Sequence, residues 1–356
     1  ALGNNGLGAS GVNWKISLMA LRISYDASST TQAIDFAADN KAREINGSWG
    51  IWPWYARNQT VAGAVKRASA KNLLMVMAAG NTNQTDGLGV PLNDDNDKKP
   101  IYPQSEVLPN VVNVTATDYS DQQVERFGKY TVDLAAPSGL ISPSYLPNGY
   151  FAIGQTSGAA PHVTGAIALL LAEEKDRIDA NPGYRQMTMG EIRYLLLTSV
   201  DPLPALKGKC VSEGRLNAYR LLLNYADSDL DGYADRIEAL FGTDPGNAAS
   251  RPDLNGDADG DGLSNAIEMG YGTIPVPVTA GADMRGKIYP IYLDASGRLL
   301  PGFTSKDTDG EGTSDFDEIM GARGYITDPA NPDTDGDGIL DGVDTSTLSE
   351  RERAVV

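Results

Sequence analysis

The sequence predicts an α/β protein in which residues 1–225 form a doubly wound parallel β-sheet and the rest has little regular structure. Short apolar runs alternate with amphipathic segments between residues 15 and 200. The apolar runs are continuous, as in strands whose two faces are both covered by helices. The composition also changes sharply after residue 225, where acidic residues and glycines become frequent.

The spacing of apolar residues predicts the elements, because it repeats about every 2 residues in strands and every 3.6 residues in helices. We expect strands over residues 16–23, 44–49, 73–79 and 111–115. We expect helices over residues 30–42, 60–71, 157–173, 189–198 and 214–224. Active sites of parallel sheets lie at the carboxyl ends of the strands, so the loops after Trp49, Ala79 and Val114 are the first to search.

The charge is distributed unevenly and predicts two domains, residues 1–225 and 226–356. Residues 1–225 carry 20 acidic and 20 basic side chains, whereas residues 226–356 carry 27 and 9, which accounts for the net charge of −18. This excess argues against a nucleic-acid partner and for cations. The single cysteine, Cys210, permits no internal disulfide. No apolar run approaches the ~18 residues of a membrane span.

The segment Gly154-Gln-Thr-Ser-Gly-Ala-Ala-Pro-His-Val-Thr-Gly-Ala166 carries the strongest chemical signal. It places Ser157 at the start of a helix rich in small residues, where substrate can approach closely. Pro161 falls in the first helical turn, where its missing N–H costs nothing. The unpaired N–H groups and the positive end of the helix dipole suit an oxyanion. The alternative is an ordinary serine at a helix start, which is common.

This segment resembles the nucleophile motif of the subtilisin-like serine proteases (subtilases). Further blocks resemble that family in the right order, over roughly residues 1–225: 45–50, 77–81, 102–103, 108–114, 132–137 and 214–219. The resemblance implies a subtilase fold that lacks its N-terminal part. It also implies a serine endopeptidase that cleaves protein or peptide substrates through an acyl-enzyme.

The resemblance also assigns roles to individual residues. Ser157 is the expected nucleophile, and the side chain of Asn81 is expected to complete the oxyanion hole. Residues expected along the substrate pocket are Ser48, Trp49, Gly50, Ala78, Ala79 and Gly80. Two positions depart from the family pattern: Gln155 replaces a usual glycine and Thr164 replaces a usual alanine.

His162, the only histidine of the chain, is five residues from Ser157 on the same expected helix. In the family the histidine of this motif is structural, and the catalytic Asp and His precede the serine. The first residues of the chain resemble the stretch that follows the family's His-Gly-Thr-His block. We therefore expect a fragment that carries the nucleophile and oxyanion hole without the catalytic Asp and His, inactive alone.

The region after residue 225 repeats one twelve-residue pattern four times, at 227–238, 257–268, 307–318 and 333–344. Each copy has acidic residues at positions 1, 3, 5 and 12 and a glycine at position 6. Calcium takes six to eight oxygen ligands, and a loop around the ion supplies them from alternate positions. The expected ligands are Asp227, Asp229, Asp231, Tyr233, Asp235 and Glu238; Asp257, Asp259, Asp261, Leu263, Asn265 and Glu268; Asp307, Asp309, Glu311, Thr313, Asp315 and Glu318; Asp333, Asp335, Asp337, Ile339, Asp341 and Asp344.

The alternative for this region is an acidic disordered linker, which would not repeat the glycine and the twelfth-position acid four times. With its proline-bearing connections, the region resembles bacterial thrombospondin type 3 repeats. Each repeat has so little core that calcium is expected to supply much of the folding energy. Such extracellular modules bind calcium with Kd values of roughly 10⁻⁴–10⁻³ M, which predicts a secreted protein.

Two functions from different classes remain open from the sequence. The first is part of a secreted, calcium-stabilised serine endopeptidase. The second is a non-catalytic protein, either a pseudoprotease that binds peptides or a calcium-stabilised extracellular spacer. Substrate preference, the oligomeric state and any role of residues 271–306 do not follow from the sequence.

Overall fold

The computed structural model describes residues 8–50, 58–82, 94–97, 99–105, 110–129, 131–143, 149–265, 305–320, 332 and 338–343. The chain divides into two compact units, one running to Pro252 and one comprising most of the residues from Asp253 onward. The 227–238 loop therefore groups with the first unit. The predicted domain boundary after residue 225 stays a prediction.

The first unit is built on a mostly parallel sheet. In the described part of the chain it has six strands in the order β1-β2-β3-β4-β8-β7. Their bounds are β1 Glu44–Gly47, β2 Leu74–Ala78, β3 Val111–Thr117, β4 Leu134–Pro137, β7 Asp201–Pro202 and β8 Gly214–Arg215. The pairs from β1 to β8 are parallel, and β7 alone runs antiparallel to its neighbour β8. The predicted α/β class is confirmed.

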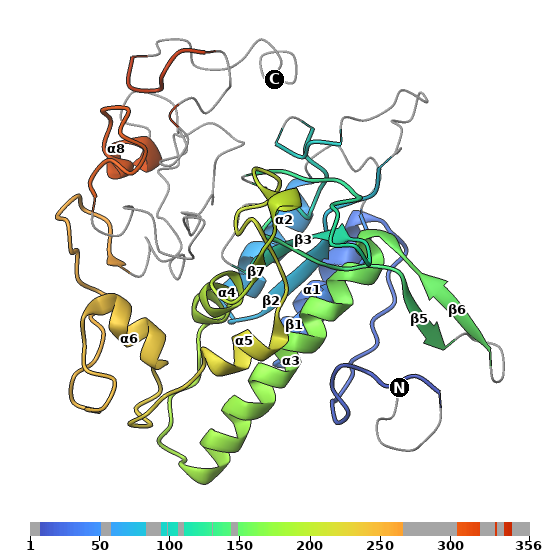
Figure 1. The fold of residues 1–356 in the computed structure, drawn as a ribbon, viewed down its shortest axis with the longest axis horizontal. Helices are drawn as coiled ribbons and strands as arrows, with labels where there is room; N and C mark the ends of the chain where they lie inside the picture. Colours follow the sequence, from blue (N-terminus) through green and yellow to red (C-terminus); the bar gives the residue numbers. More distant parts are fainter. Residues whose placement is uncertain are drawn as a thin grey trace. The chain divides into compact units, whose positions relative to one another are not determined.

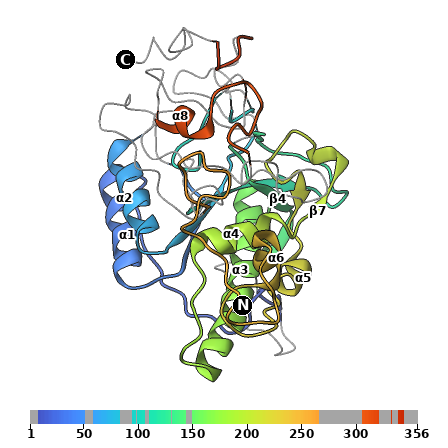
Figure 2. The ribbon, with the colours of Figure 1, turned by 90° about the vertical axis from the view of Figure 1, so that its left-hand side faces the viewer.

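Helices cover both faces of this sheet. Their bounds are α1 Ala27–Asp39, α2 Gln59–Ser69, α3 Gln155–Ala180, α4 Met189–Leu197 and α5 Ala218–Leu223. Helix α3 packs along β1 to β4 (Figure 1), and α1 pairs with α2. Figure 2 shows α1 and α2 on one side of the strands and α3, with which α5 is in contact, on the other. Helix α4 begins at the end of α2, where Ser69 Oγ lies 3.8 Å from Met189 Sδ. This double cover explains why every residue of β2 and β3 is buried.

The helix starts agree with local sequence signals. Asp26 and Asn58 cap α1 and α2 by accepting hydrogen bonds from backbone N–H groups of the first turn. Helix α4 begins with a capping box, in which Thr188 and Glu191 each accept from the other's backbone N–H.

The predicted strand over residues 16–23 is wrong. These residues have no regular secondary structure, and Leu18 is 85% exposed. The segment has the composition of a strand, but a strand needs a paired neighbour to satisfy its backbone groups. The sequence analysis also missed the antiparallel hairpin of β5 (Leu140–Pro143) and β6 (Tyr150–Ile153). Each of its strands has only four residues and is largely or partly exposed, so neither shows the period of a half-buried strand.

Among the described residues, helix α6 (Asp235–Phe241) in the first unit and helix α8 (Asp315–Met320) in the second begin within acidic loops. Each begins at position 9 of its loop. Helix α6 ends at Gly242, which adopts the left-handed conformation typical of a helix C-terminus. No helix in the described part of the chain combines the length and the apolar character that crossing a membrane requires.

Candidate active site and cation sites

Ser157 is the third residue of α3 and is partly exposed. The helix begins directly after the β5–β6 hairpin, so the serine lies where the chain leaves one element for another. Gln155 has φ +60°, a left-handed conformation that favours glycine. This explains the glycine usual at this position in the family, and this chain accepts backbone strain next to the expected nucleophile.

Asn81 lies in the loop after β2 and meets the start of α3. Its side-chain oxygen Oδ1 accepts from the backbone N of Thr156 at 3.3 Å and from the Thr156 hydroxyl at 2.9 Å. The two bonds hold the amide with its NH₂ group turned away from Thr156. The structure therefore brings the Asn81 amide to Thr156, the residue before Ser157, although Asn81 is far from both in sequence.

The residue after β1 also contacts the serine segment. Ser48 Oγ donates to the backbone carbonyl of Ser157 at 3.1 Å and accepts from Asn46 Nδ2 at 3.2 Å. The Thr164 hydroxyl donates to Asn46 Oδ1 at 3.1 Å. Thr164, the second departure from the family pattern, thus begins a hydrogen-bonded chain that reaches the main chain of the serine. Sequence analysis flagged Thr164 without this role and missed Asn46 and Thr156, whose partners come from other elements.

The remaining residues expected at the substrate pocket divide into two groups. Trp49 and Gly50 are partly exposed, and the Trp49 carbonyl accepts from Gln104 Nε2 at 3.4 Å. Ala78, Ala79 and Gly80 are buried. Ala79 packs in a core cluster, and its carbonyl accepts from the buried Asn96 at 2.9 Å. The place of these residues along a substrate pocket stays a prediction.

The imidazole of His162 bonds to its own helix. Its Nδ1 lies 3.0 Å from the backbone carbonyl of Gly158, one turn earlier. Because the carbonyl can only accept, Nδ1 donates in this contact. This geometry is that of a structural histidine, as the family resemblance implies.

The three acidic loops in the described residues share one conformation. In each, the carboxylate at position 1 accepts from the N–H groups of positions 4 and 6. The side chains at positions 3 and 5 each accept from the N–H two residues later. Position 6 is a glycine with φ between +97° and +105°. Position 4 is also left-handed, and it is Leu230 in the first loop and glycine in the others.

Carboxylate oxygens converge in each of these loops. Oxygens from Asp227, Asp229 and Asp231 lie within 4.8 Å of one another. The same holds for two further sets, Asp257, Asp259 and Asp261, and Asp309, Glu311 and Glu318. Burial and the neighbouring acids raise the pKa of Asp309 to about 7. The donors are hard oxygens without nitrogen or sulfur, which fits calcium.

Position 9 closes the loop in all three cases. Asp235, Asn265 and Asp315 each accept from the N–H of position 2, at 2.7 to 2.9 Å. In the fourth loop, Ile339 and the buried Asp341 are described. Five expected ligands lie outside the described residues: Glu268, Asp333, Asp335, Asp337 and Asp344.

Relatives of known class match part of the chain. Thermitase of Thermoactinomyces vulgaris is 29% identical over 227 residues, which are 62% of this chain and 70% of thermitase. The thermostable alkaline protease of Halalkalibacterium halodurans is 30% identical over 174 residues, 47% of this chain and 43% of that protein. The solved structure of the prenylagaramide maturation protease PagA has a TM-score of 0.44 and 24% identity, covering 58% of this chain and 70% of that one.

The family model described as the Subtilase family, peptidase S8, matches residues 1–233. This range contains the sheet, helix α3 with Ser157, and the loop with Asn81. The chain therefore belongs to the subtilase family.

Proposed function

We propose that this chain carries the nucleophile and the oxyanion site of a subtilisin-type serine endopeptidase. The observation that carries the proposal is the contact of Asn81 with Thr156. It holds the Asn81 amide at the residue before Ser157, and the backbone N–H of Ser157 at the helix start would supply a second donor.

The proposed reaction is acyl transfer. Ser157 Oγ attacks the scissile carbonyl carbon and loses its proton to a general base, while the carbonyl oxygen becomes an oxyanion that accepts from Asn81 Nδ2 and the Ser157 N–H. The C–N bond breaks as the amine leaves with the proton, and water then hydrolyses the ester. We do not assign the base to His162, which lies five residues after Ser157 on the same helix and whose imidazole bonds to the carbonyl of Gly158 in that helix. We assign the base and its aspartate to blocks that precede the serine in the family order.

The first test is an assay of this chain on peptide substrates. Loss of the base in a serine triad lowers kcat by about 10⁶, so we expect turnover near the background rate. When the preceding blocks are joined to the chain, we expect activity. Ser157→Ala should then abolish acylation, and Asn81→Leu should lower kcat by about 10²–10³. Turnover of this chain alone at a normal protease rate would contradict the proposal.

The second candidate function is non-catalytic, and Gln155 is the observation that favours it. A strained non-glycine residue two positions before the serine is a departure that a pseudoprotease would tolerate. If the preceding sequence of the gene lacks an Asp block and a His block, the chain is a peptide-binding pseudoprotease or a calcium-stabilised spacer.

We further propose that the acidic loops bind calcium, as thrombospondin type 3-like repeats. Their common conformation brings carboxylate oxygens together in each described loop. Because modules of this kind need calcium at about 10⁻⁴–10⁻³ M, we propose a secreted, extracellular protein. Isothermal titration with calcium chloride tests the binding, and an absence of heat at millimolar calcium would contradict it.

A further inference from the structure

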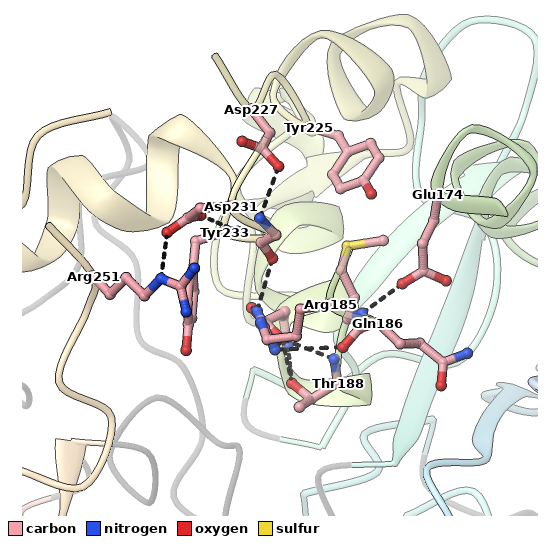
Figure 3. A network of polar contacts seen from close by, with 12 residues as sticks. Glu174, Arg185, Gln186, Thr188, Tyr225, Asp227, Asp231, Tyr233 and Arg251 are labelled. Carbon is pink, nitrogen blue, oxygen red and sulfur yellow. Dashed lines mark hydrogen bonds and ion pairs between the residues drawn. The ribbon is translucent and has the colours of Figure 1, made fainter. Parts of the chain in front are cut away.

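The first acidic loop, residues 227–238, differs from the others in what surrounds it. Loops 2 and 3 contact each other within the second unit: Lys306 Nζ donates to the Gly260 carbonyl at 2.8 Å, and Gly262 lies against the Phe316 ring. Loop 1 belongs to the first unit, where Asp227, Asp231 and Tyr233 lie beside residues of the peptidase fold (Figure 3).

Loop 1 contains a buried carboxylate without a partner. Glu238, at position 12, is 0% exposed, and neither of its oxygens has a hydrogen-bond partner. A buried, unpaired carboxylate is costly unless a cation compensates it. Glu238 is thus an observation separate from the converging aspartates that indicates a cation.

Asp227 connects this cluster to helix α3. Its Oδ2 accepts from the Tyr184 hydroxyl at 2.6 Å, and Arg177 Nη1 lies 3.8 Å away. Arg177 is in the last turn of α3, donates to Tyr184 at 3.2 Å and stacks over the Tyr225 ring at 4.2 Å. Oδ1 of Asp227 accepts from Leu230 N–H at 2.8 Å and keeps a lone pair for an ion.

A second connection runs to helix α4. Arg185 Nη2 donates to the Gly232 carbonyl at 3.0 Å, and its guanidinium lies 4.0 Å from the centre of the Tyr233 ring. The same guanidinium pairs with Glu191, the capping-box residue of α4. Gly232 has φ +97°, and a Cβ there would lie 2.6 Å from Arg185 Cβ. The glycine that shapes the loop therefore also permits this contact.

We propose that a calcium ion bound by Asp227, Asp229, Asp231 and Glu238 is a stabilising element of the peptidase unit. It holds the end of α3 and the start of α4 through Tyr184 and Arg185. The inference rests on the calcium binding proposed above. It adds that calcium bound in loop 1 stabilises the peptidase unit that carries Ser157. Without the ion, repulsion among the four carboxylates opposes the position of Asp227 that Tyr184 requires.

The test is hydrogen exchange of the full chain with and without about 10 mM calcium, followed by peptide mass spectrometry. At a Kd of roughly 10⁻⁴–10⁻³ M, linkage predicts that calcium slows exchange across residues 174–195 by about 10- to 100-fold. Helix α1, which packs against α2, serves as the internal reference.

Matched variants distinguish coupling from binding. Asp229→Asn removes the negative charge at position 3 of loop 1, and Asp259→Asn removes the negative charge at position 3 of loop 2. In the Asp259→Asn variant, we expect calcium to slow exchange across residues 174–195 as it does in the unmodified chain. In the Asp229→Asn variant, we expect calcium to slow this exchange by less than about 3-fold. Tyr184→Phe, which leaves the ligands intact, should keep the calcium protection of residues 227–238 and weaken that of residues 174–187.

If calcium protects residues 174–195 equally in Asp229→Asn and Asp259→Asn, the proposed coupling of loop 1 to these residues is wrong. The calcium binding proposed for the acidic loops would still stand. Full protection of residues 174–187 in Tyr184→Phe would overturn the route through Tyr184. If calcium protects none of the acidic loops in the unmodified chain, the calcium binding under the proposed function fails as well.

Discussion

Gln155 shows how one residue near the expected nucleophile can have an energetic cost. A side chain with φ near +60° is disfavoured by about 1 kcal/mol relative to glycine, and Gln155 is exposed, so packing offsets none of this. We expect Gln155→Gly to raise the free energy of unfolding by up to about 1 kcal/mol in urea denaturation. Gln155→Ala is the control, because it keeps the Cβ and should leave stability nearly unchanged. Equal effects of the two variants would contradict the strain.

Glu44, at the start of β1, makes stability depend on pH. Burial raises its pKa from 4.5 to about 8, and its Oε2 is buried without a hydrogen-bond partner. Between these two pH values the unfolded chain releases a proton that the folded chain keeps, so stability falls as pH rises through this window.

Glu44→Gln should therefore stabilise the protein by about 1–3 kcal/mol at pH 8, and the difference should disappear below pH ~4.5. Urea unfolding at a series of pH values measures this. A constant difference across the series would show that titration of Glu44 is not the cause.

At the scale of elements, helix α3 is held to its neighbours by Glu174. This side chain is 2% exposed, with Oε2 2.7 Å from Arg43 Nη1 and Oε1 accepting from the Met187 N–H at 2.5 Å. One carboxylate thus joins the helix that carries Ser157 to the residue before β1 and to the segment before α4.

Glu174→Ala should lower the free energy of unfolding by about 2–4 kcal/mol, because it leaves Arg43 and a backbone N–H without their acceptor. Asp179→Ala, in the same helix, removes an exposed pair with Lys175 and should change stability by less than about 0.5 kcal/mol. Similar losses in the two variants would argue against the buried pair.

At the scale of the whole molecule, calcium should decide how much of the chain is folded. Each described loop gathers carboxylates around a small volume, in a chain with a net charge of −18. Chelation should therefore unfold the second unit and loosen, without unfolding, the sheet of the first, whose core contains no acidic loop. Limited proteolysis with and without chelator measures both effects. A second unit equally resistant in both conditions would contradict this prediction.

The sequence predicted the family, the parallel sheet and most helices, because apolar periodicity and ordered motifs are local signals. Helix α2 and strands β2 and β3 agree with the expected ranges within a few residues. The strand over residues 16–23 failed because pairing depends on a neighbouring strand, which no local pattern reports. The short strands β7 and β8 carry too few residues to show a period.

By itself, the sequence determined the serine motif, the repeated acidic loops and the position of the glycines that shape them, since these depend on residue type and spacing along one segment. Tertiary structure alone decided that Thr156 orients Asn81, that Thr164 reaches Ser157 through Asn46 and Ser48, and that loop 1 contacts α3 and α4. Each of these contacts joins residues from different elements. Their meeting is set by the packing of α3 and its neighbours on the sheet, which no single segment encodes.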